Sequence, residues 1–136
     1  MARILSIDYG LKRTGLAVTD PLQIIATGLC TVETPRLMNY LKEYMAKETV
    51  EKIIIGEPYN LDDSETHITK DVKLFMSRLK KTFPAIEVVG VDERFTSKMA
   101  GRAMIDMGMK KKDRRNKALV DEIAATMMLQ EYLEKN

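Results

Sequence analysis

Hydrophobic and polar positions along the first quarter of the chain predict three short strands, at residues 3–8, 14–19 and 24–32. Turns as short as those between them are typical of an antiparallel meander. Pro35 then precedes apolar residues that recur at helical spacing, so we expect an amphipathic helix to start there. The apolar side of this helix carries Leu37, Leu41, Tyr44 and Met45.

The rest of the chain alternates between strands and helices. The continuously apolar stretch at 52–56 is typical of a strand buried on both faces. A polar loop follows, in which Asp62, Asp63 or Ser64 could cap a second helix that ends before Pro84. Residues 86–92 read as a fifth strand. Thr96 could cap a helix running to about Met107, and a final helix is expected from about Lys117 to Glu134.

This order of elements predicts an α/β fold. Three meander strands followed by strand–helix alternation indicate a mixed five-stranded sheet, with three antiparallel strands, then two parallel ones, and helices on both faces. A length of 136 residues, without linker or repeat, favours one domain over residues 1–136. The chain has no long apolar run and no signal-peptide pattern, and its one cysteine, Cys30, cannot form an internal disulfide. We therefore expect a soluble, cytoplasmic protein.

The net charge of +2 conceals an uneven distribution. Residues 94–117, the basic segment, contain nine basic and two acidic residues, a net of +7, which leaves −5 for the rest. Such a segment predicts an anionic partner, and its alternative interpretation is a solvated surface. The candidates for nucleic-acid binding, two of them in the first turn, are Lys12, Arg13, Arg94, Lys98, Lys110, Lys111, Lys112, Arg114, Arg115 and Lys117.

Several acids occur where a strand or an apolar helix face predicts hydrophobic residues. Asp8 ends the first strand, and Asp121 falls on the apolar face of the last helix. Glu93 follows the fifth strand, and Glu57 follows the fourth. Three of them have an ordinary explanation: Asp8 a turn, Asp121 a buried salt bridge or a backbone hydrogen bond, and Glu93 a loop before a helix. Alternatively, they converge at the crevice beyond the strand ends of an open sheet.

Converging carboxylates repel one another unless a cation lies between them. Oxygen ligands favour Mg²⁺ or Mn²⁺, and the chain has no Cys/His cluster for zinc. His67, the only histidine, is expected on a helix surface. Carboxylates that bind Mg²⁺ beside a basic patch would form a phosphodiesterase site. Asp8, Glu93 and Asp121 are the candidate catalytic and metal-binding residues, and Glu57 is a further candidate ligand.

Four stretches, in this order, resemble the YqgF/RuvX family over essentially the whole chain: "SIDYGLKRTGLAV", "IIIGEPYNLD", "VDERFTS" and "KALVDEIAATMMLQEYL". The resemblance implies a ribonuclease H-like fold, related to RuvC-type Holliday-junction resolvases. It also implies a nuclease role in maturing the 5′ end of the small-subunit ribosomal RNA precursor, with Asp8, Glu93 and Asp121 as the site acids. The basic loop before the last helix would contact nucleic acid. The chain departs from the family at Asp63, where glycine is usual, and at Glu57, where we expect an apolar residue.

Other functions stay open at this point. A Holliday-junction resolvase would need a homodimer, whereas trimming of single-stranded RNA needs only a monomer. A catalytically silent ribosome-assembly factor, binding nucleic acid or a pre-ribosomal particle, would keep the acids without using them for cleavage. A nucleotide-binding phosphotransferase is disfavoured, because the chain is short and its seven glycines do not cluster. Tyr9, Tyr59 and Phe95 lie near the expected crevice and could stack bases or simply pack.

Overall fold

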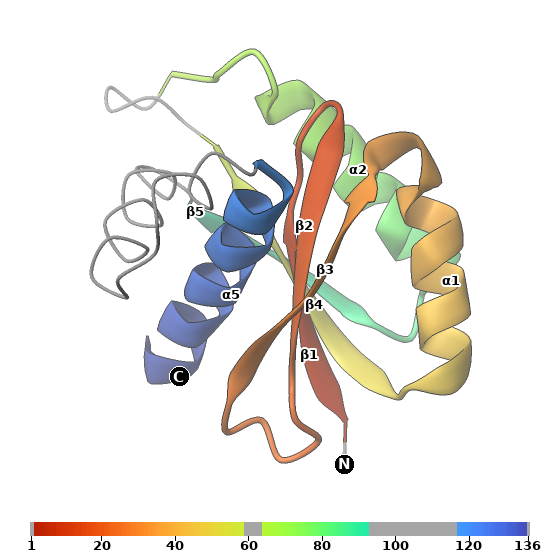
Figure 1. Cartoon of the computed structure of the whole chain (residues 1–136). Helices are drawn as coiled ribbons and strands as arrows, with labels where there is room; N and C mark the ends of the chain where they lie inside the picture. The colour runs from red at the N-terminus through yellow and green to blue at the C-terminus, as the bar shows by residue number, and fades with distance from the viewer. Residues whose placement is uncertain (1, 59–63, 93–116, 136) are drawn as a thin grey trace.

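The structure is a computed structural model that describes residues 2–58, 64–92 and 117–135. In these ranges the chain forms one sheet with helices on both of its faces (Figure 1). The elements are β1 (Arg3–Asp8), β2 (Arg13–Thr19), β3 (Ala26–Glu33), the 3₁₀ turn η1 (Thr34–Arg36), α1 (Leu37–Lys47), β4 (Val50–Glu57), α2 (Thr69–Thr82), β5 (Glu87–Asp92) and α5 (Lys117–Lys135). The helix expected over residues 96–107 and the loop at 110–116 lie outside the described residues.

The sheet has the strand order β3-β2-β1-β4-β5, so β1 is its central strand. β1 and β2 pair antiparallel, as do β2 and β3, whereas β4 pairs parallel with both β1 and β5. The expected mixed sheet, with three antiparallel strands and then two parallel ones, is confirmed. The three parallel strands end at the same edge of the sheet, with Asp8, Glu57 and Asp92 as their last residues.

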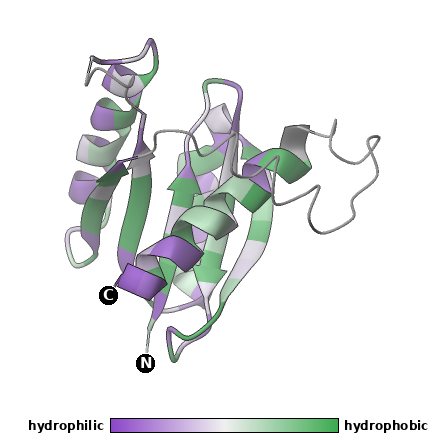
Figure 2. Ribbon diagram, turned by 90° about the vertical axis from the view of Figure 1, so that its left-hand side faces the viewer, coloured by the Kyte–Doolittle hydropathy of each residue, from purple (hydrophilic) through white to green (hydrophobic). Residues whose placement is uncertain are grey.

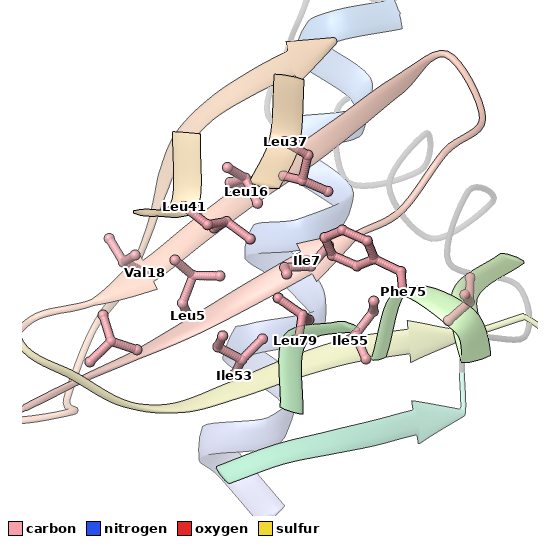
Figure 3. Close-up of a cluster of buried hydrophobic side chains, with 12 residues drawn as sticks. Leu5, Ile7, Leu16, Val18, Leu37, Leu41, Ile53, Ile55, Phe75 and Leu79 are labelled. Atoms are coloured by element: carbon pink, nitrogen blue, oxygen red, sulfur yellow. The ribbon is translucent and has the colours of Figure 1, made fainter. Parts of the chain in front are cut away.

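Alternation of side chains along each strand builds a separate core on each face of the sheet. Leu5 and Ile7 of β1 belong to the larger cluster, which α1 and α2 cover (Figure 3). Ile4 of β1 and Ile54 of β4 belong to the other cluster, under α5. Figure 2 shows α5 lying across this second face, with the strands behind it. Since Ser6 follows Leu5 and Asp8 follows Ile7, both are expected on the α5 face.

Small side chains let α5 pack closely on the sheet. Ala124 and Ala125 are buried against it together with Met128 and Leu129. β1 and β2 fill the space beside these two alanines. Neither α5 nor any other helix within the described ranges is long and apolar enough to cross a membrane.

The third strand begins later than its sequence pattern predicts. Ile24 and Ile25 are exposed in the turn before β3, although their β-branched side chains favour a strand. The Asp20 carboxylate holds this turn by accepting the backbone N–H groups of Leu22, Ile24 and Ile25 at 3.1, 2.8 and 2.7 Å. These hydrogen bonds, that from Ile25 above all, lower the pKa of Asp20. Side-chain capping of the turn therefore overrides local strand propensity here.

The second helix also starts differently from the prediction. Ser64 does not cap it, because α2 begins only at Thr69, with Ile68 as its N-cap residue. Thr66 holds the entry instead: its hydroxyl accepts the N–H of Ile68 at 3.3 Å. The Thr69 hydroxyl accepts the N–H of Thr66 at 2.8 Å. Asp62 and Asp63, the alternative caps, lie outside the described residues.

Candidate active site

Asp8 is the last residue of the central strand, where the sheet opens onto its loops. Its side chain shares the α5 face with Ser6, whose hydroxyl donates a 2.9 Å hydrogen bond to the Ala125 carbonyl oxygen of α5. Across the antiparallel ladder, Asp8 pairs with Gly15 of β2. β1 pairs with β2 as far as Asp8 and with β4 as far as Ile7, so Asp8 ends a strand that is held on both sides.

Asp121 approaches the same place from α5. Gly15 is buried, and a Cβ atom at this residue would lie 2.0 Å from the Asp121 carbonyl oxygen and 2.9 Å from the Glu122 nitrogen. Real Cβ atoms do not approach backbone so closely, so glycine is required for the helix to reach the sheet here. The first half of α5 is thereby held against the end of β2, with Asp121 at the contact.

Gly15 thus joins the two acids. It is the cross-strand partner of Asp8 and the backbone neighbour of Asp121, although the two acids are far apart in the sequence. Directly opposed residues of an antiparallel pair have Cα atoms about 4.5–5.5 Å apart. The fold therefore brings Asp8 and Asp121 to one spot, on one face, at the carboxyl end of β1.

Arg13 lies beside this spot and pairs with Asp121. Its Nε atom is 3.4 Å from the Asp121 Oδ2 atom, and the two side chains are 38% and 27% exposed. The apolar pattern of α5 predicts a deeply buried acid, whereas the structure shows a partly exposed carboxylate beside a cation. A salt bridge is thus present at Asp121, but it is partly exposed and not the buried one considered from the sequence. Arg13, expected to bind nucleic acid, faces the candidate site itself.

Ser6 and Gly15 are positioning residues that the sequence analysis did not single out. Ser6 is fully buried, and its hydroxyl anchors the middle of α5 to the central strand. Because Gly15 has no side chain, the N-terminal half of the same helix can pack against β2. Each is an exception within an otherwise apolar strand: a hydroxyl in "RILSID" and a glycine in "RTGLAVT". A glycine inside a strand often marks close approach of another backbone, and that signal could have identified Gly15.

Glu57 lies at the same edge of the sheet but on its other face. It follows Ile55 by two residues, and Ile55 belongs to the core that α1 and α2 cover. The Glu57 side chain extends over Gly90 of β5, since a Cβ atom at Gly90 would meet its carboxylate. Asp92, the register partner of Glu57, alternates onto the same face as Gly90. The sheet therefore separates Glu57 and Asp92 from Asp8 and Asp121.

Several predicted site residues lie outside the described ranges. They are Glu93, the stacking candidates Tyr59 and Phe95, and the side chains of the basic segment. Lys12 is exposed in the β1–β2 turn. His67 is also exposed, but it lies in the turn before α2 and not on the helix surface that the sequence predicted. No three His, Cys, Asp or Glu side chains gather as a metal site among the described residues, which contain Asp8 and Asp121 but not Glu93.

Solved structures with this arrangement of strands identify the fold. Thermus thermophilus RuvC in complex with a Holliday junction substrate superposes with a TM-score of 0.58 and 18% sequence identity. The match covers 99% of this chain and 95% of that one. A second structure of Thermus thermophilus RuvC matches with a TM-score of 0.52 and 16% identity. The fold is therefore the ribonuclease H-like fold of RuvC, as the sequence resemblance implies.

Similarity in sequence is much closer to another group. A protein of Phocaeicola vulgatus, which carries the name "Putative pre-16S rRNA nuclease", is 56% identical over 98% of this chain and 96% of its own length. A protein of Bacteroides thetaiotaomicron with the same name is also 56% identical, over 98% of this chain and 97% of its own. The family model RuvX, described as Holliday junction resolvase, matches residues 2–135. This chain therefore belongs to the RuvX family, a family of nucleases.

Proposed function

We propose that this chain is a metal-dependent nuclease that hydrolyses phosphodiester bonds in the 5′-end processing of the 16S ribosomal RNA precursor. One observation carries the nuclease part: Gly15 brings Asp8 and Asp121 together at the end of the central strand. The RNA substrate is supported by the name that the relatives from Phocaeicola vulgatus and Bacteroides thetaiotaomicron share. Cytoplasmic ribosome biogenesis is the corresponding process.

The donor set fits a hard divalent cation. Asp8 and Asp121 supply carboxylate oxygens, which suit Mg²⁺ or Mn²⁺. Glu93 follows β5 directly, and continued alternation after Val91, which packs under α5, would direct it to the same face. We therefore propose Asp8, Glu93 and Asp121 as metal ligands and leave out Glu57, because it lies on the opposite face of the sheet.

Each residue of the proposed site has a separate role in binding the cation or the substrate. When bound, the cation activates a water molecule and offsets negative charge at the leaving oxygen. Asp8 and Asp121 keep their positions because β1 is paired on both sides and α5 is anchored at Ser6 and Gly15. Arg13 offsets the Asp121 charge and, once released, can bind a substrate phosphate. The basic segment would hold the nucleic-acid backbone.

Junction resolution is the second candidate function. It is supported by the description of the family model and by the fold shared with RuvC. Cutting a four-way junction symmetrically needs two sites related by a two-fold axis, and hence a homodimer. An assembly factor without catalysis is the third outcome to be tested.

A cleavage assay tests the proposal. Labelled 16S precursor RNA, single-stranded RNA, single-stranded DNA and a four-way junction are incubated with Mg²⁺, Mn²⁺ or EDTA. We expect metal-dependent cutting of RNA by the wild type. Asp8→Asn, Glu93→Gln and Asp121→Asn should each reduce it by more than the roughly 10- to 100-fold that loss of an outer-shell partner costs a metal site.

Glu57→Gln is the matched control, an acid at the same sheet edge on the other face, and it should keep its activity. Full activity in one of the three acid variants would remove that residue from the site. Preferred cutting of the junction would shift the assignment to the resolvase. Binding without cutting of any substrate, the 16S precursor included, would favour the assembly factor.

A further inference from the structure

A hollow of about 260 Å³ lies beside the candidate active site, on the face of the sheet that α1 and α2 cover. The β1–β2 turn, the start of α1 and the middle of α2 surround it. Figure 3 shows Phe75, one of its lining residues, on α2 near the end of β1. We call this hollow the Tyr9 pocket. Its lining includes Tyr9, Leu11, Met38, Phe75 and Arg78.

Aromatic rings form the wall of the Tyr9 pocket. The ring centroids of Tyr9 and Phe75 are 5.2 Å apart, with their planes inclined at 36°. The guanidinium carbon of Arg78 lies 5.7 Å from the Phe75 ring centre. Among the described residues the structure gives Arg78 no ion pair, and its side chain is exposed at the rim. An aromatic wall with a guanidinium beside it is the combination on which nucleic-acid bases stack.

The turn that carries Tyr9 is held in place before any ligand arrives. The Thr34 hydroxyl donates to the Gly10 carbonyl oxygen, and the Thr34 N–H donates to that of Lys12 at 3.0 Å. Leu11, also on this turn, is 53% exposed, which leaves an apolar rim without a partner among the described residues.

Size and position limit what the pocket can accept. Its volume is below the range of about 300–1,000 Å³ typical of sites that enclose a whole drug-sized ligand. It suits one planar ring system with the rest of the molecule outside. Tyr9 directly follows Asp8, and successive side chains of a strand point to opposite faces. The pocket and the Asp8 carboxylate thus lie on the two sides of one strand tip.

We propose that the Tyr9 pocket binds one unstacked base of the nucleic-acid strand whose phosphodiester lies at Asp8. The base stacks on Tyr9, with the Arg78 guanidinium and Leu11 at the rim. This inference rests on the proposed function, and it adds a requirement: the strand is single or locally opened next to the cut. A base held there fixes the position of the neighbouring phosphate relative to Asp8.

An abasic scan tests the pocket. A labelled single-stranded RNA of about 12 nucleotides, within the range of known single-strand sites, carries one abasic residue at each position in turn. Affinities are measured by fluorescence anisotropy at low salt in EDTA, without cleavage. We expect one position at which the missing base weakens wild-type binding by about 5- to 150-fold, the equivalent of stacking one base.

In Arg78→Gln and Tyr9→Leu that position-specific loss should shrink to a few-fold at most. Lys80→Gln, an exposed cation on the same helix outside the pocket lining, should keep the full loss. Circular dichroism verifies the fold of each variant, and Arg78→Gln removes no buried side chain. Three outcomes would overturn the proposed base-binding role of the Tyr9 pocket. These are an abasic scan in which no position weakens binding more than the others, a position-specific loss that is unchanged in both pocket variants, and no binding of the intact strand. A clear scan with no metal-dependent cutting would overturn the nuclease proposal alone.

Discussion

At the scale of single residues, the Arg13 side chain pairs with the Asp121 carboxylate. In the proposed metal site, the guanidinium and the cation would compete for this carboxylate. Metal binding at Asp121 would therefore replace an ion pair within the chain. Because both side chains are partly exposed, that bond contributes at most about 1 kcal/mol.

Arg13→Gln is expected to tighten Mn²⁺ binding by up to about 5-fold, since the competing cation is gone and up to about 1 kcal/mol no longer opposes the metal. Isothermal titration calorimetry measures this without substrate. Lys12→Gln, an exposed cation in the same turn, is the control and should change the affinity less. Weaker Mn²⁺ binding in Arg13→Gln would contradict the competition.

At the scale of elements, the contact of α5 with β2 and β3 decides where Asp121 lies. Two glycines on these strands face the helix with different neighbours. A Cβ atom at Gly15 would meet the Asp121 backbone, whereas one at Gly28 would meet the Glu122 side chain, 2.4 Å from its Oε1 atom. Backbone within a helix cannot yield unless the helix moves, but a long side chain can adopt another rotamer.

Gly15→Ala should therefore lower the free energy of unfolding by about 1–3 kcal/mol, the usual cost of overpacking, and reduce cleavage by shifting Asp121. Gly28→Ala should stay within about 1 kcal/mol of the wild type, because neither glycine has a positive φ that would strain alanine. Urea unfolding of both variants measures the difference. Equal decreases in the free energy of unfolding at the two positions would mean that α5 can shift over the sheet to accommodate alanine at Gly15.

At the scale of the whole molecule, charge is separated along the chain. The basic segment carries +7 against −5 elsewhere, and in the sequence it lies between β5 and α5, the helix that carries Asp121. We expect it to supply most of the sequence-independent affinity for nucleic acid, which falls with salt as counterions return to the phosphates.

Replacing Lys110, Lys111, Lys112, Arg114 and Arg115 with glutamine should weaken binding of single-stranded RNA and flatten its salt dependence. For single strands each lost phosphate contact reduces the slope of log K against log salt by about 0.7, so five contacts would remove about 3.5. Anisotropy titrations over a range of salt concentrations give the slope. An unchanged slope would make the segment a solvated surface, the alternative that its composition left open.

Local patterns determined the elements and the main anomalies. Alternation and helical spacing predicted every described strand and helix, because each period depends only on neighbouring residues. They also identified Asp8 as an acid ending an apolar strand and Asp121 as an acid on an apolar helix face. Where local side-chain bonds compete with propensity, as at Asp20 and Thr66, the boundaries of β3 and α2 differ from the prediction.

Only the tertiary structure decided which of these residues meet. The register of β1 with β2 places Gly15 opposite Asp8, and close helix packing brings Asp121 to the same glycine. Glu57 and Asp8 both stand at the end of an apolar strand, so the sequence pattern did not distinguish them. In the structure they lie on opposite faces of the sheet. The sequence determined which residues are candidates for the chemistry, because residue type and local period are its own properties. Their convergence depends on strand register and helix packing, which arise from contacts between distant parts of the chain.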